Sequence, residues 1–217
     1  MVREAARLRH SLRSLLRRQG SRVRTLPRGG TLRPIVEGEL ALIEAAGGAK
    51  IAELIMPLVD VHEGIIKFVK AADSQLKRKA EELPATRSFL QIPGVGYLAA
   101  LAFFSVIEDP ARFARSEDVA AFLGLVPRVK QSGTVTRRSG ITKGGDRLTR
   151  KSLVMSSWVM ISRAKKDCAL KDWGRALAER SGHYTARVAL ARKLSVVMLS
   201  MWKRGASFDP YPSAMRE

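Results

Sequence analysis

The sequence contains little cysteine and little acid, and it has no long apolar run. Its single cysteine, Cys168, cannot form an internal disulfide, and no Cys or His spacing typical of a zinc site is present. No stretch approaches the roughly 18 consecutive apolar residues that a membrane-spanning helix needs, and arginines interrupt the apolar part that a signal peptide would require. We therefore expect a protein of a reducing cytoplasm, with no membrane partner and no metal ligands in this chain.

The shortage of acid leaves a large positive charge. The 217 residues include 39 Lys and Arg against 20 Asp and Glu, which gives a formal net charge of +19. An excess of this size predicts a polyanionic partner. Because 46% of the residues are hydrophobic, the chain can build a packed core and is not a disordered basic tail.

The first part of the chain has helical patterning with narrow apolar stripes. Residues 1–33 hold ten arginines and one acid, and leucines recur on one helical face. A longer stripe runs over residues 51–69 and contains Pro57, which predicts a kink or a break. Helices with a single narrow stripe pair with each other or with a second chain. We therefore expect a helical linker or coiled coil in residues 1–84.

Pro84 marks a change of character, and we predict a domain boundary close to it. Apolar helical segments separated by turns follow, and strand signal is sparse. The last two helices are predicted over residues 148–164 and 187–202. Residues 125–151 have the composition of a basic loop, with eight Lys or Arg, one acid and several glycines. The expected fold is mostly α: the linker is followed by a compact helical domain in residues 85–206 and a flexible tail in residues 207–217.

A glycine-rich turn lies between two apolar segments of the second region. Gly94, Val95 and Gly96 form a turn that opens directly into a helix, and the arrangement resembles the helix-hairpin-helix motif that grips nucleic-acid backbones. Glycine lets the backbone approach a phosphate, and the free amides of the next helix point at it. We expect these residues to hold DNA without reading its sequence. The alternative is a turn that only joins two core helices.

The basic loop contains a serine surrounded by cations. Ser132 precedes a glycine, and the candidate phosphate-binding residues around it are Arg128, Lys130, Arg137, Arg138, Lys143 and Arg147. A serine hydroxyl is a weak nucleophile unless a base or dense positive charge activates it and stabilises the transition state. From these residues alone, the simpler interpretation is a solvated turn that touches phosphate.

Three further residue types have plain structural interpretations. The tryptophans Trp158, Trp173 and Trp202 have apolar neighbours at helical spacing, so we expect them in the core rather than as platforms for base stacking. Asp146, the one acid of the basic loop, either orients a lysine or arginine or caps a helix. The acid next to Cys168 disfavours a thiolate, so we do not expect a cysteine nucleophile.

An ordered series of short blocks adds a family resemblance. The blocks are IPGVG at 92–96, DPARF at 109–113, GLVPR at 124–128, QSG at 131–133 and ITKGGDRL at 141–148. With these blocks, the chain resembles the C-terminal half of a family of bacterial insertion-sequence transposases. Members of that family join a RuvC-like DEDD domain to a serine-bearing transposase domain, and a bridge RNA guides them.

The resemblance implies a function in DNA strand cleavage and exchange. It implies that Ser132 is the nucleophile and that the six cations neutralise phosphates near the cut. It also implies DNA and RNA as partners, a homo-oligomer formed through residues 1–84, and a bacterial protein associated with the nucleoid in the cytoplasm.

The family's metal site lies in the half that this sequence does not contain. The resemblance implies four acids and a divalent metal in the RuvC-like half, whereas this sequence begins at the linker, with Glu4 as the only acid before Glu37. We therefore assign no cofactor to this chain. We expect a truncated remnant, a product of an internal start, or a subunit that borrows the missing half, and its activity would depend on that half.

Two other classes of function stay open at this stage. A non-catalytic nucleic-acid-binding or dimerisation module derived from a transposase would use the same basic surface without a covalent step. A membrane-surface or scaffold protein driven by its Arg-rich helix would lose all binding when residues 1–33 are removed. A DNA-binding domain would keep its affinity after that deletion.

Overall fold

The computed structural model describes residues 1–132 and 135–212, with side chains described outside 129–139. The chain divides into two compact units, Met1–Gln75 and Leu76–Glu217. Within the described ranges no helix is both long and apolar enough to cross a bilayer.

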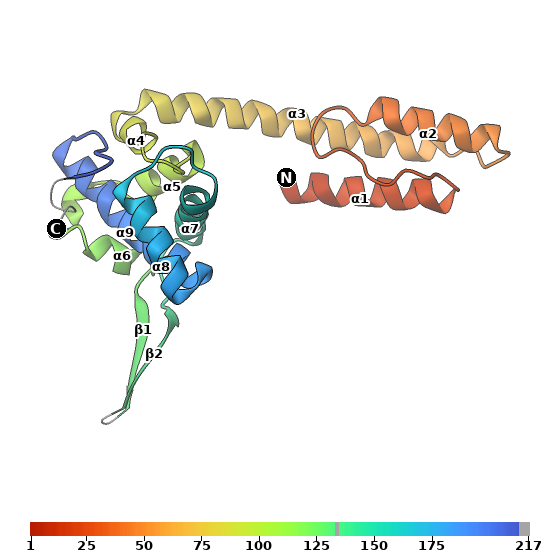
Figure 1. Ribbon diagram of the computed structural model, residues 1–217. Helices are drawn as coiled ribbons and strands as arrows, with labels where there is room; N and C mark the ends of the chain where they lie inside the picture. Colours follow the sequence, from red (N-terminus) through yellow and green to blue (C-terminus); the bar gives the residue numbers. More distant parts are fainter. Residues whose placement is uncertain (133–134, 213–217) are drawn as a thin grey trace. The chain divides into compact units, whose positions relative to one another are not determined.

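The elements in chain order are α1 (Val2–Arg18), α2 (Arg33–Ala45), α3 (Ala52–Glu82), α4 (Pro84–Phe89), α5 (Tyr97–Ile107), the 3-10 helix η1 (Pro110–Arg112), α6 (Asp118–Phe122), β1 (Pro127–Ser132), β2 (Val135–Ile141), α7 (Arg147–Ser162), α8 (Ala169–Ser181) and α9 (His183–Arg204) (Figure 1). The mostly α fold is confirmed.

The first unit packs α1, α2 and the first part of α3 around a small apolar core. Its buried members are Leu12, Leu16, Leu26, Leu32, Val36, Leu40, Ile43, Ile55 and Val59. α3 continues through Pro57 as one helix, so of the two alternatives predicted there, a kink or a break, the break does not occur. Glu63 of α3 accepts hydrogen bonds from the side chain of Thr31 and from the backbone amides of Leu32 (2.8 Å) and Arg33 (3.0 Å). These bonds lower the pKa of Glu63 and cap the start of α2.

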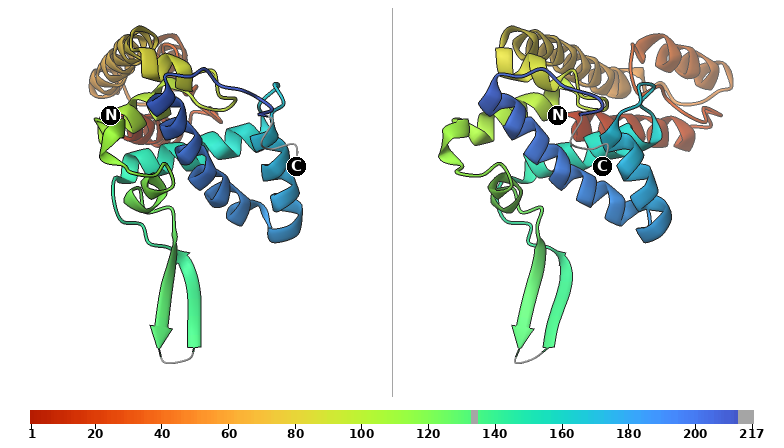
Figure 2. Two further views of the ribbon diagram at one scale, coloured as in Figure 1. Left: turned by 90° about the vertical axis from the view of Figure 1, so that its left-hand side faces the viewer. Right: turned by 60° about the vertical axis from the view of Figure 1, so that its left-hand side comes forward.

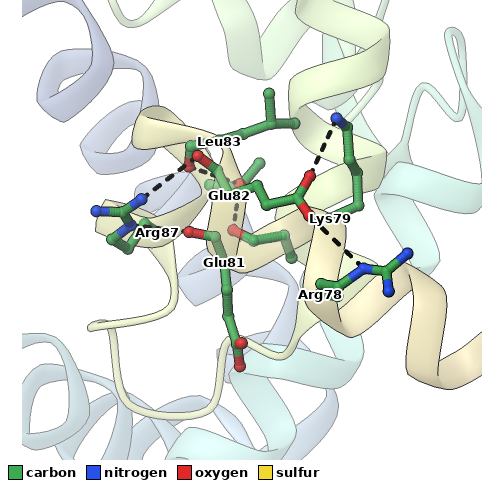
Figure 3. A network of polar contacts seen from close by, with 8 residues as sticks. Arg78, Lys79, Glu81, Glu82, Leu83 and Arg87 are labelled. Carbon is green, nitrogen blue, oxygen red and sulfur yellow. Dashed lines mark hydrogen bonds and ion pairs between the residues drawn. The ribbon is translucent and has the colours of Figure 1, made fainter.

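The end of α3 is capped by a side chain from the helix that follows it. Arg87 donates from Nε to the carbonyl oxygen of Glu81 (2.8 Å) and from Nη2 to that of Glu82 (3.4 Å) (Figure 3). Leu83 between the helices is extended, with φ −79° and ψ 125°. Pro84 favours this conformation because its ring disfavours helical geometry in the residue before it. The guanidinium therefore satisfies carbonyls that the turn leaves open.

α9 is the central helix of the second unit. α4, α6, α7 and α8 all pack against it, and α5 packs against α7. The buried core includes Phe89 and Phe103, whose rings meet edge to face with centroids 5.5 Å apart. Trp202 stacks on Phe104 at 4.9 Å. Residues 207–212 return along this core, where the amide of Phe208 donates to Oε1 of Gln91 (3.0 Å).

A β-hairpin replaces most of the loop expected over residues 125–151, so that prediction is wrong. β1 and β2 form a two-stranded antiparallel sheet. Figures 1 and 2 show this ribbon extending away from the helices of the second unit. β-Branched Val135, Thr136 and Ile141 favour extended backbone. The high charge and the glycines of this segment are typical of loops, which is why a loop was predicted.

Candidate nucleic-acid interface

The hairpin places Ser132 at the end of β1. Ser132 pairs with Val135, and Pro127 pairs with Ile141 at the other end of the ribbon. At about 3.3 Å per residue, Ser132 lies roughly 16 Å along the strand from Pro127. Gly133, the last residue of the QSG block, lies outside the described residues. The backbone therefore carries the predicted nucleophile to the far end of the ribbon.

The hairpin sequence carries charge of one sign. Residues 127–141 contain four Lys or Arg and no Asp or Glu. The strand register pairs Lys130 with Arg137 and Val129 with Arg138. Like charges directly opposite each other destabilise a strand pair. A ribbon with this sequence suits an anionic partner.

Two close backbone contacts fix the base of the hairpin. Gly124 has φ +67°, and a Cβ there would lie 2.2 Å from the carbonyl oxygen of Gly144. Gly145 has φ +69°, and its Cβ would lie 2.1 Å from the carbonyl oxygen of Phe122. Only glycine fits at these positions. Arg150 donates from Nη1 to the carbonyl oxygen of Gly144 (2.6 Å) and holds the same junction.

Asp146 links this junction to α7. Its carboxylate accepts a hydrogen bond from the backbone amide of Thr149 (2.5 Å), which lowers the pKa of Asp146. The hydroxyl of Thr149 donates to the carbonyl oxygen of Ala102 (3.1 Å) and ties the start of α7 to α5. Of the two roles left open for Asp146, the helix cap is the one observed. We did not predict a role for Arg150, although its spacing of four residues from Asp146 is a recognisable signal.

Three of the predicted DNA-binding cations lie at the base of the hairpin. Arg128, Lys143 and Arg147 are exposed. None of them takes part in an ion pair within the described part of the chain. Arg128 donates from Nη2 to the carbonyl oxygen of Thr142 (3.3 Å), so its guanidinium is partly oriented. These groups are free to pair with phosphates.

The three residues of the turn at 94–96 differ in packing and exposure. A Cβ on Gly94, whose φ is +87°, would lie 2.6 Å from the carbonyl oxygen of Ser156 and 2.8 Å from the amide nitrogen of Met160. This glycine therefore packs directly against α7. Val95 is buried, with 7% of its surface exposed. Gly96 is exposed, has no atom within 4 Å of its Cβ position, and begins α5 without a side-chain cap.

The two predicted contact regions are separated along α7. The hairpin base joins α7 at Asp146, whereas Gly94 packs on α7 at Ser156. At 1.5 Å per residue, the helix between these positions is about 15 Å long. The structure thus gathers Arg128, Lys143 and Arg147 near one end of α7 and places the Gly94 turn farther along it.

The described residues do not fit a metal centre. Within residues 1–132 and 135–212, no three His, Cys, Asp or Glu side chains form a group that could hold a metal ion. The family resemblance implies a divalent metal in the RuvC-like half of such a transposase, so we assign no residue of this chain to it. Cys168 is buried, and burial raises the pKa of its thiol, which disfavours the reactive thiolate.

Part of the second unit is similar in sequence to a family of transposases. Residues 86–173 match the sequence profile of the transposase IS116/IS110/IS902 family. The matched segment includes the Gly94 turn, the hairpin with Ser132, and all of α7.

Curated relatives agree with the family match. Over 137 residues the chain is 34% identical to the transposase for insertion sequence element IS1111A of Coxiella burnetii, a match covering 63% of this chain and 38% of that protein. Over 211 residues it is 26% identical to a probable family 20 transposase of Pseudomonas aeruginosa, covering 97% of this chain and 62% of that protein. The chain therefore spans between 38% and 62% of the length of these two relatives. Together, the matches support a relationship to the IS110-type transposases.

Proposed function

We propose that this chain is the serine-bearing part of an IS110-type transposase and acts on DNA in the transposition of an insertion sequence. The observation that carries the proposal is the cationic hairpin, in which the backbone brings Ser132 to the end of β1. A two-stranded ribbon fits the major groove of DNA, and a surface of one sign suits the phosphate backbone. The family match over residues 86–173 includes this hairpin.

In the proposed reaction, Oγ of Ser132 attacks a scissile phosphodiester. The Oγ–P bond forms while the bond from phosphorus to one deoxyribose oxygen breaks. The serine proton passes to a base or to water, and the released sugar oxygen takes up a proton. Because the phosphoserine link conserves bond energy, a hydroxyl group from another strand can reverse the attack and join the strands. No external energy source is needed.

The cations have two roles in the proposed reaction, according to their place on the hairpin. Lys130, Arg137 and Arg138 on the ribbon neutralise the charge of the transition state near the cut. Arg128, Lys143 and Arg147 at the base hold flanking phosphates. The start of α5 at Gly96 holds the DNA backbone farther away, through amides near a helix N-terminus. Positioning of this kind is sequence-independent, so target choice must come from elsewhere.

We further propose that the chain works as a homo-oligomer with an RNA partner. The first unit leaves Val61 and Phe68 of α3 exposed, at 53% and 57%, which favours contact with another copy. Phe68→Glu should lower the mass found by sedimentation. Ser74→Glu adds the same charge to an exposed position of the same helix and should leave that mass unchanged. An equal mass for the parent and both variants would contradict this interface.

The covalent step distinguishes an enzyme from a binding module. A DNA suicide substrate, offered with a full-length homologue and its RNA, should trap a covalent adduct with this chain. Ser132→Ala should form none, whereas Ser139→Ala, which changes the other serine of the hairpin, should form as much as the parent. Equal adduct from Ser132→Ala would refute the nucleophile. Salt-dependent DNA binding without any adduct would favour the non-catalytic module.

A further inference from the structure

A groove between α7, α8 and α9 lies outside the surface used by the proposed function. Its volume is about 430 Å³, and its lining includes Trp158, Arg175, Glu179, His183 and Arg187. This volume lies within the roughly 300–1,000 Å³ range of small-ligand pockets. We expected Trp158 to be a core residue, but it is only half buried and lines the groove.

Aromatic rings and guanidinium groups are in contact in this groove and beside it: Trp158 and Arg187 line the groove, whereas Arg163 and Tyr184 contact these two residues from outside the lining. The Cζ atom of Arg163 lies 4.6 Å from the ring centroid of Trp158. The Cζ atom of Arg187 lies 5.6 Å from the same ring and 5.3 Å from the ring of Tyr184. Tyr184 is 83% exposed, more than any other large hydrophobic side chain among the described residues. Its ring therefore offers an open flat surface beside a cation.

The groove has a surplus of positive charge. Arg163, Arg175 and Arg187 take part in none of the ion pairs found in residues 1–132 and 135–212. Arg175 makes one long hydrogen bond, from Nε to the carbonyl oxygen of Ile161 (3.4 Å). Glu179 is the one acid among the described residues of the lining. An anionic ligand would therefore find more cations than competing carboxylates.

The helices hold the walls of the groove in place. A Cβ on Gly174 would lie 3.0 Å from Cδ2 of Leu190 and 3.2 Å from Cγ1 of Ile161, so α8 approaches both neighbouring helices closely. Ala178, a small and nearly buried residue, lines the groove. Close helix packing limits the freedom of the walls, and a preorganised site loses less entropy on binding.

We propose that this groove binds unpaired nucleotides of a single-stranded nucleic acid. Bases would stack on Tyr184 and Trp158, and phosphates would pair with Arg163, Arg175 and Arg187. Unpaired bases expose their faces, so they stack on aromatic rings and on guanidinium planes, and nearby cations pair with the phosphates of the strand. Duplex DNA keeps its base faces stacked and offers only the phosphate contacts. An RNA strand and a melted DNA strand share this chemistry, so either is a candidate source.

Binding titrations on the full chain test the groove. The probes are labelled single-stranded RNA and single-stranded DNA of the same unstructured sequence, and the corresponding duplex DNA. Tyr184→Ala, which removes an exposed ring, should weaken single-strand binding by about fivefold or more for one lost stacking contact and leave duplex binding unchanged. Trp158→Leu should act in the same way. Trp173→Leu is the matched control, since Trp173 contacts a cation, Lys193 at 4.7 Å, but Trp173 does not line the groove and Lys193, unlike the Arg187 that contacts Tyr184, is not a lining residue either.

The pattern of losses separates this inference from the proposed function. Loss confined to the single strands supports the groove, and the more strongly affected strand identifies its source. Equal loss for single strands and duplex, loss in Trp173→Leu as large as in Trp158→Leu, or no loss in Tyr184→Ala would overturn it. If the parent binds no duplex but its single-strand affinity still depends on Tyr184, the groove stands and the proposed DNA-binding function fails.

Discussion

Replacement of Gly94 by alanine tests whether this residue is required for packing against α7. A φ of +87° costs an L-residue about 1–2 kcal/mol. The added Cβ would also lie 2.6 Å from the carbonyl oxygen of Ser156, and overpacking of this kind costs about 1–3 kcal/mol. The free energy of unfolding of the second unit should therefore fall by about 2–5 kcal/mol.

Gly96→Ala is the matched control for this substitution. No atom lies within 4 Å of the Cβ position of Gly96, so the free energy of unfolding should change by less than about 1 kcal/mol. In thermal unfolding followed by circular dichroism, Gly94→Ala should lower the Tm of the second unit by roughly 4–20 °C. Equal Tm values for the two variants would refute the packing argument.

Three further predictions concern α7 and the hairpin. Asp146→Ala should lower the free energy of unfolding by about 1 kcal/mol in urea titrations at neutral pH. Folding lowers the pKa of Asp146 from the carboxyl group's ordinary value of 3.8. The stabilisation from this cap is therefore complete above pH 3.8 and is lost as the pH falls through the lower folded pKa. The variant should consequently lose less stability in acid than the parent. Replacement of residues 128–140 by a short glycine linker should leave the Tm of the second unit nearly unchanged but weaken DNA binding measured by fluorescence anisotropy. Lys130→Gln should reduce the slope of log affinity against log salt by about 1.

Each of these predictions has a result that contradicts it. An Asp146→Ala variant with the parent's stability at every pH would remove the capping role. A large loss of Tm without the hairpin would mean that the ribbon stabilises the helical unit. An unchanged salt slope in Lys130→Gln would mean that this residue does not contact phosphate.

The helical part of the fold was readable from the sequence because its signals are local. Apolar periodicity predicts α7 and α9, and Asp146 stands where a helix cap belongs. α8 was missed because Gly174 interrupts a charged segment and weakens the local helical signal. In the folded chain, α8 packs against α7 and α9.

The features that distinguish the candidate sites depend on tertiary structure. The backbone contact between Gly124 and Gly144 joins residues 20 positions apart, and no periodicity reveals it. The groove likewise forms only when Trp158 and Arg187, from different helices, come together. The hairpin was missed because glycines and cations favour a loop interpretation. The family resemblance singled out Ser132, which its local environment alone did not distinguish from a solvated turn.

The chemical identity of the DNA-linked residue is the most direct test of the account. The trapped protein–DNA adduct would be digested with protease and nuclease, and the nucleotide-bearing peptide would be sequenced by mass spectrometry. The account predicts a phosphodiester remnant on Ser132 and none on Ser139. A remnant on any other residue would contradict the claim that the hairpin carries the nucleophile.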